Sequence, residues 1–81
     1  MANSEPIAAQ AARDLFDALQ AKGVALLGLD GFVRHDERLI ASLTMLIDFS
    51  ADAPAKATAR AHAFLRQHEA PNHLFELWWA D

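Results

Sequence analysis

The sequence predicts a small α+β domain in which helices dominate. Apolar residues recur at helical spacing in three segments, whereas the continuous apolar run Val24–Leu29 is too short and too uniform for a helix. Eighty-one residues can build one hydrophobic core, so we expect residues 1–81 to form a single domain. The expected element order is α-β(-β)-α-α-β, with the helices on one face of a two- or three-stranded sheet.

The first expected helix covers Ser4–Lys22. Ser4 is a suitable N-cap, and Pro6 suits the first turn, where its missing N–H costs nothing. Gly23 follows the last helical residue, as is typical of a helix C-terminus. The pattern therefore predicts one amphipathic helix at the start of the chain.

Residues 24–34 are expected to form a buried strand, with a second short strand returning from it. The run Val24–Leu29 carries only apolar residues and glycine, which is typical of a strand covered on both faces. Asp30-Gly31 is a dipeptide that favours tight turns. Phe32–Arg34 would then form the second strand of a hairpin.

Two further helices are expected in the middle of the chain. Between His35 and Ser50 the larger apolar residues return to helical spacing at Leu39, Ile40, Leu43, Leu46 and Ile47. A break follows, in which Asp52 can cap a third helix and Pro54 can occupy its first turn. That helix is expected to end near His68.

Residues 72–80 fit either a strand or a helix. A strand would separate these residues into two faces, one with Phe75, Leu77 and Trp79 and the other with Leu74, Glu76 and Trp78. A helix capped by Asn72 would instead group Leu74, Phe75 and Trp78. The strand is the preferred interpretation. The alternative is an all-α four-helix domain, which the scarcity of Val and Ile supports.

The composition argues against several classes of function. The chain has a formal net charge of −4, which disfavours nucleic acid as a partner because phosphate neutralisation supplies most of that affinity. There are no cysteines and no long apolar stretch, so we expect a cytoplasmic protein that does not bind membranes. Lys56, Arg60 and Arg66 form a locally basic segment, and the sequence leaves open whether it has a ligand.

Catalytic and metal-binding patterns are not found. The four histidines lack the i, i+3 or i, i+4 spacing that helical metal ligands need, and no hydrolase, P-loop or dinucleotide motif is present. Asp48 stands out because it lies between Ile47 and Phe49, and a specific partner is expected for it. The sequence therefore predicts a protein without enzymatic activity, cofactor or metal.

Protein–protein interaction is the predicted function. Adjacent tryptophans on a strand or helix cannot both face the same core, and tryptophan is enriched at binding hot spots. We expect a homodimer or accessory subunit, with an interface formed by Trp78, Leu74, Leu27 and Trp79. The alternative is an inhibitor or immunity-type protein that caps a basic toxin or nuclease surface through Asp14, Asp17, Asp30, Asp36 and Glu37.

Overall fold

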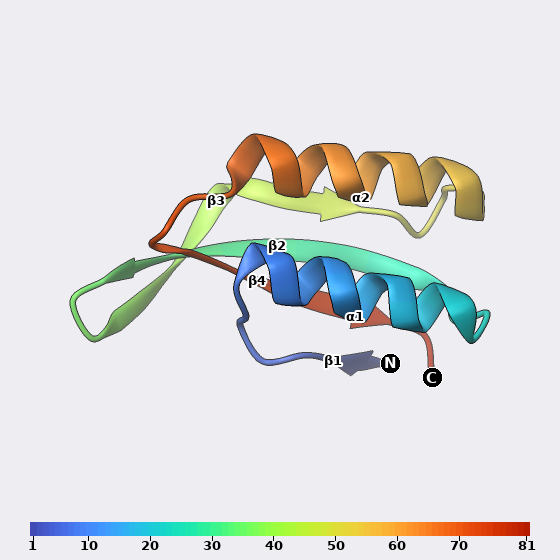
Figure 1. The fold of residues 1–81 in the computed structure, drawn as a ribbon, viewed down its shortest axis with the longest axis horizontal. Helices are drawn as coiled ribbons and strands as arrows, with labels where there is room; N and C mark the ends of the chain where they lie inside the picture. The colour runs from blue at the N-terminus through green and yellow to red at the C-terminus, as the bar shows by residue number, and fades with distance from the viewer.

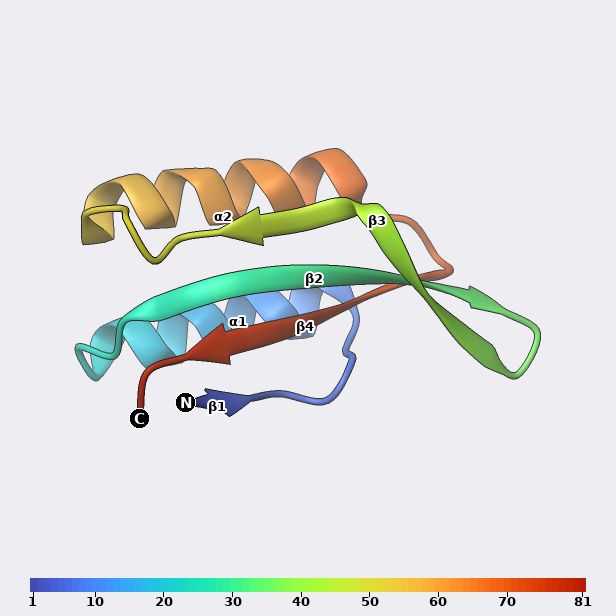
Figure 2. The same cartoon turned by 180° about the vertical axis from the view of Figure 1, so that it is seen from behind.

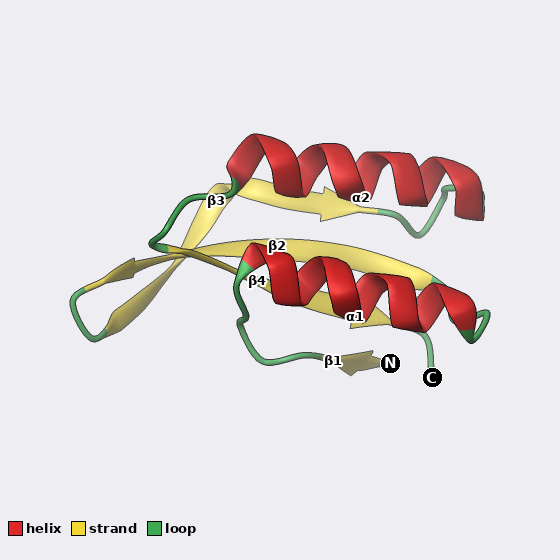
Figure 3. Cartoon of the chain, in the orientation of Figure 1, coloured by secondary structure: helices red, strands yellow, loops and turns green.

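Two helices lie side by side over one face of a four-stranded antiparallel sheet (Figure 1). The computed structural model describes all residues from 1 to 81. The elements in chain order are β1 (Ala2–Asn3), α1 (Ala9–Ala21), β2 (Leu26–His35), β3 (Arg38–Asp48), α2 (Pro54–His68) and β4 (His73–Trp79), and Figure 3 separates them by type. The strand order across the sheet is β1-β4-β2-β3. The longest strands, β2 and β3, form a hairpin whose tip projects beyond both helices (Figure 1).

The α+β class fits the prediction, but the predicted element order is wrong. The all-α alternative is not supported, because residues 72–80 contain the strand β4. The sheet has four strands where two or three were expected, and the chain has two helices where three were expected. Both helices do lie on one face of the sheet, and Figure 2 shows the other face with the strands in front of α1.

The largest correction concerns residues 35–50, which form an edge strand and not a helix. Asp36 and Glu37 make the hairpin turn, with Asp36 at a φ of 57°. Met45, Ile47 and Phe49 alternate toward the helix layer, where Met45 and Phe49 are buried. Apolar residues at every second position indicate a strand. The helical spacing of the neighbouring leucines made this pattern hard to recognise in the sequence.

Asp30-Gly31 is not a turn, because β2 runs straight through it. The register between β2 and β3 shifts at this point, so that residues 42–45 of β3 stand against Gly31 alone. A Cβ on Gly31 would lie 2.5 Å from the Cβ of Met45. Glycine is therefore required here for the close approach of two strands, and not for a bend in the chain.

The N-terminal helix is shorter than expected, because residues 2–7 pair with β4. Ser4 does not cap α1. Its backbone N–H donates to the carbonyl of Leu77 at 2.9 Å, and its hydroxyl accepts the Leu77 N–H at 3.0 Å. The helix begins only at Ala9 and ends, as expected, just before Gly23, which has a φ of 74°. The second helix has Ala53 as its N-cap in place of Asp52.

The core lies between the helices and the sheet and contains no polar or charged buried residue. Phe16 of α1 and Leu65 of α2 pack with Leu29, Phe75 and Leu77 of the two central strands, and all five are nearly inaccessible to solvent. Ala12, Ala57 and Ala61 allow the helices to approach closely. Neither helix has the length and the apolar character needed to cross a membrane.

Candidate functional site

Side chains alternate along each strand, so the residues that point into the core identify those on the face of the sheet that no helix covers. On β4, Phe75 and Leu77 point into the core, so Leu74, Glu76 and Trp78 lie on the opposite side. The same rule applies along β2 and, through register, along β3. We call this side the open face and define it by Asp30, Phe32, Arg34, Leu39, Leu46, Leu74, Glu76 and Trp78.

Trp78 is the largest side chain of the open face. It stands opposite Gly28, which has no side chain to occupy the space beside the ring. Its indole Nε1 donates a hydrogen bond of 3.0 Å to Oδ2 of Asp30. Trp78 is half-buried, so its ring still offers apolar surface to a partner.

Two carboxylates lie next to each other in the middle of the open face. Asp30 and Glu76 are direct cross-strand neighbours in the register of β2 and β4. Glu76 accepts a hydrogen bond of 3.1 Å from Nδ2 of Asn3, and neither carboxylate has an ion-pair partner. Like charges directly opposite each other destabilise a sheet, so this pair is unfavourable in the isolated chain.

Apart from Met1, the exposed large apolar residues all lie on β3, which is an edge strand. Leu39 is 42% exposed, Ile40 48%, Leu46 52% and Leu43 89%. The outer side of β3 pairs with no other strand. A long apolar edge strand is a template for association with another chain, and most soluble monomers avoid one.

The four predicted interface residues do not all lie together. Trp78 and Leu74 share the open face, but Trp79 packs against the core on the helix side. Leu27 is half-buried at the register shift between Leu26 and Gly28. Sequence reasoning missed Phe32 and Arg34 of β2 because a turn was expected at Asp30-Gly31, and it missed Leu39 and Leu46 of β3 because that segment was expected to be a helix.

The predicted acidic surface is scattered over the molecule. Asp14 and Asp17 lie on α1, on the other side of the sheet from Asp30. Asp36 and Glu37 form the tip of the hairpin. Only Asp30 belongs to the open face, and the structure shows no single acidic patch made by these five residues.

The basic segment of α2 is partly used within the fold. Arg60 forms an ion pair with Asp52, donates to the backbone carbonyl of Asp48 at 3.2 Å, and stacks over the Phe49 ring at 5.7 Å. Lys56 and Arg66 are exposed and make no ion pair. Arg60 therefore connects α2 to the end of β3, and the segment is not a continuous charged site.

The partner of the Asp48 carboxylate is Ser50, two residues further along the chain, and not a cation of α2, since Asp48 forms no ion pair. Hydrogen bonds from Ser50 lower the pKa of Asp48 below its usual range, the hydroxyl contributing most and then the backbone N–H, which lies 2.8 Å from Oδ1. The positive charge of Arg60 lowers this pKa further. The carboxylate closes the turn after β3, so its role is structural.

The four histidines do not assemble into a metal site. His62 lies 3.7 Å from a carboxylate oxygen of Asp17, and its ring forms a T-shaped pair with the ring of Phe16. The His73 ring contacts the backbone carbonyl of His68, while the His68 ring packs on Phe64. No group of three or more His, Cys, Asp or Glu side chains is arranged to hold a metal ion.

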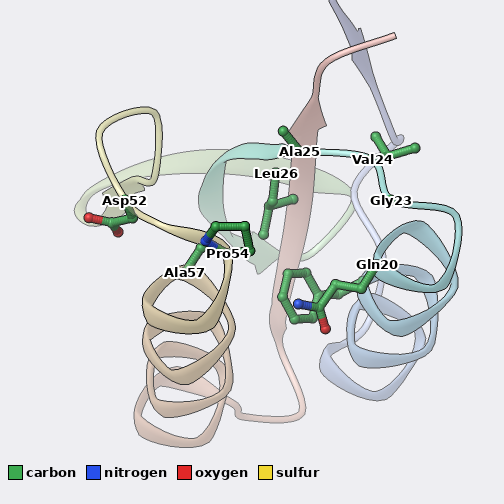
Figure 4. Close-up of a pocket in the computed structure, with 9 residues that line it drawn as sticks. Gln20, Gly23, Val24, Ala25, Leu26, Asp52, Pro54 and Ala57 are labelled. Carbon is green, nitrogen blue, oxygen red and sulfur yellow. The ribbon is translucent and has the colours of Figure 1, made fainter.

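A cavity of about 170 Å³ opens between the end of α1 and the start of α2. Phe16, Val24, Leu26 and Ala57 make most of its lining apolar. Figure 4 shows the Asp52 carboxylate directed away from the other lining side chains, in keeping with its pairing to Arg60. The two polar side chains of the lining, Gln20 and Asp52, are already bonded to Thr58 and Arg60, so the cavity lacks the converging polar groups that fix a ligand.

Comparison of the chain with protein-family models, with curated proteins and with solved structures found no match.

Proposed function

We propose that this chain is a non-catalytic protein–protein interaction domain that self-associates as a homodimer through its open face. The observation that carries the proposal is that three strands place partly exposed apolar residues on one uncovered side of the sheet, around the Asp30–Glu76 pair. Phe32, Leu46, Leu74 and Trp78 all lie on the side of the sheet that no helix covers. Burying such a surface against another chain is the common solution in soluble proteins.

A second copy is the simplest partner. Closed twofold dimers are the most frequent oligomers, and each copy presents the same apolar surface to the other. Leu39, also on the edge strand β3, adds a further exposed apolar side chain to this surface. Because the acidic residues are scattered, no observation favours the inhibitor alternative. The cytoplasmic location expected from the sequence remains part of this proposal.

Sedimentation velocity over a range of concentrations tests the proposal. The wild-type chain is expected to sediment as a dimer at micromolar concentration. Trp78→Ala should weaken association by about 2 kcal/mol, or roughly thirtyfold in dissociation constant, because it removes the largest side chain of the open face. Leu46→Lys should weaken association to a similar degree, because it places a charge within the apolar interface. Leu46 is exposed in the monomer, so this change should leave the fold intact.

The matched control is Ala59→Lys, which places the same new charge on the exposed side of α2. It should leave the dissociation constant unchanged. Circular dichroism checks that each variant keeps the fold. A wild-type chain that stays monomeric at several hundred micromolar, or equal effects of Leu46→Lys and Ala59→Lys, would show that the open face is not an interface.

A further inference from the structure

The charges of the open face define a more specific arrangement of the dimer. Asp30 and Glu76 form a carboxylate pair without a cation, and Arg34 is a cation without a carboxylate. All three lie on the same side of the sheet. Along β2, the negative charges of Asp30 and Glu76 therefore precede Phe32 and the positive charge of Arg34 follows it, before the acidic turn Asp36-Glu37.

Phe32 lies midway between these opposite charges. Asp30, Phe32 and Arg34 are successive residues on one face of β2, so each step covers about 6.6 Å along the strand at about 3.3 Å per residue. Leu74 is the direct neighbour of Phe32 on β4. An apolar centre is thus flanked at equal distances by an acidic pair and by one arginine.

We infer that two copies pack face to face about a twofold axis, so that Arg34 of each copy lies against Asp30 and Glu76 of the other. The axis lies between the two sheets, perpendicular to β2, and passes next to Phe32. The inference rests on the proposed function and specifies its geometry. This rotation reverses the direction of β2 in the second copy, so the Asp30–Glu76 pair of each copy meets Arg34 of the other. Phe32 and Leu74 of both copies then meet at the centre, as in packed sheets about 10 Å apart.

The charges of the open face favour this arrangement over a different twofold axis and over a different partner. An axis through Trp78 and the carboxylate pair would bring four carboxylates together, which opposes association. A basic segment of another protein would neutralise Asp30 and Glu76 but would leave Arg34 without a partner. A second copy rotated about Phe32 satisfies the charges at both ends, so the favoured partner is this chain itself.

A charge exchange between two variants tests the arrangement. Arg34→Asp should weaken the homodimer about thirtyfold or more, because it places a carboxylate against Asp30 and Glu76 of the other copy. Glu76→Arg should also weaken it, since the new guanidinium faces the Arg34 guanidinium of the other copy.

Mixing the two variants should restore association. In the heterodimer the introduced aspartate of one chain meets the introduced arginine of the other, while the unchanged Arg34 meets the unchanged Glu76. One end then keeps the wild-type charges, and at the other end the introduced arginine offsets the remaining Asp30, so the heterodimer should bind more tightly than either variant homodimer. Sedimentation velocity of each variant alone and of the equimolar mixture measures the difference.

Arg38→Asp is the matched control. Arg38 lies on the same hairpin and also lacks an ion pair, but it occupies the other side of the strand from Leu39. This change should leave the dissociation constant within about threefold of the wild-type value. If Glu76→Arg fails to fold, Glu76→Gln keeps the side-chain shape, and it should weaken the homodimer less than Arg34→Asp does.

The outcomes separate the inference from the proposed function. A wild-type dimer that is insensitive to Arg34→Asp, or a mixture that does not form heterodimers, overturns the arrangement about Phe32 but leaves dimerisation in place. A monomeric wild type overturns both. Binding of an arginine-rich probe peptide to a monomeric wild type would identify a basic partner for Asp30 and Glu76 and would equally overturn the inference.

Discussion

The two faces of the same sheet carry different kinds of residue, although they are built from the same strands. The helix-covered face contributes Leu29, Phe75 and Leu77, which are almost fully buried and have no charged neighbour in the core. The open face contributes Asp30 and Trp78, which keep contact with solvent. Because successive side chains of a strand point to opposite faces, every second residue of β2 and β4 packs in the core and specifies the fold. The residues between them remain available to a partner.

The sharpest test of this division compares two leucines on β4. Leu77→Ala should lower the free energy of unfolding by about 2 to 5 kcal/mol, because Leu77 is inaccessible and its removal leaves a cavity in the core. Leu74→Ala, three residues earlier on the open face, should cost well under half as much. Urea unfolding under conditions that keep both variants monomeric measures the difference.

Equal losses for the two leucines would contradict the division, since they would mean that the open face is as important to the monomer as the core is. The association assay completes the comparison. Leu74→Ala should weaken the dimer because Leu74 lies beside Phe32 on the open face.

The glycines of β2 offer a second comparison between the two faces. A methyl group on Gly31 would point toward the helix layer and collide with Met45, whose Cβ would be 2.5 Å away. Gly31→Ala should therefore destabilise the chain by about 1 to 3 kcal/mol, because β3 must shift to admit the methyl group. Thermal unfolding should show a midpoint lower by roughly 4 to 8 °C per kcal/mol.

Gly28→Ala is the matched change on the other side of the strand. Its Cβ would lie 3.0 Å from the carbonyl oxygen of Ile47, a contact that a small local shift can relieve. The midpoint should fall less than for Gly31→Ala. A larger effect at Gly28 than at Gly31 would show that Met45 moves aside more easily than the backbone of the edge strand does.

The sequence allowed the α+β class, the second helix and the alternation of β4 to be predicted. Proline at a helix start and alternating apolar residues at the chain end act locally, so they can be recognised without the rest of the fold. The division of Phe75 and Leu77 from Leu74 and Trp78 was predicted in this way, and the structure shows it. Those residues include half of the predicted interface.

The parts that were predicted wrongly depend on contacts between distant segments. Leu39, Leu43 and Leu46 have helical spacing, but pairing with β2 makes this segment a strand. Ser4 has the chemistry of an N-cap, but its hydroxyl and N–H are used by Leu77, far along the chain. Tertiary pairing overrides local propensity in both cases, and a single sequence does not display it.

The turn at the hairpin tip contains Asp36, the only non-glycine residue with a positive φ. This residue has a φ of 57°, which glycine adopts at no steric cost. Asp36→Gly should therefore stabilise the chain by about 0.5 kcal/mol, since relief of the backbone strain is partly offset by the greater freedom of glycine in the unfolded state.

Glu37→Gly is the control for the turn, because Glu37 does not have a positive φ and gains nothing from glycine. It should be neutral or destabilising in the same thermal unfolding measurement. A stabilising effect at both positions would mean that general flexibility of the tip, and not the backbone of Asp36, limits stability.

The smallest expected effect concerns Asp48, where β3 ends and the open face gives way to the turn before α2. Hydrogen bonds from Ser50 and the charge of Arg60 lower the pKa of Asp48, so the folded state binds its proton more weakly than the unfolded state does. Its contribution to stability is therefore fully present above the unfolded pKa of about 3.9 and is lost as the pH falls through the lower folded value.

Replacement of the Asp48 carboxylate by a neutral amide tests this contribution. Asp48→Asn should lower the unfolding midpoint at pH 7. The gap to the wild type should begin to narrow below the unfolded pKa of about 3.9, and it should close only below the lower folded pKa, where the wild-type carboxylate is neutral in both states. Ser50→Ala removes the hydroxyl that lowers this pKa most, so the pH-dependent part of stability should shrink but not vanish, because the backbone N–H and Arg60 remain. A gap that stays constant as the pH falls would mean that the shape of the Asp48 side chain, and not its charge, holds the end of the edge strand.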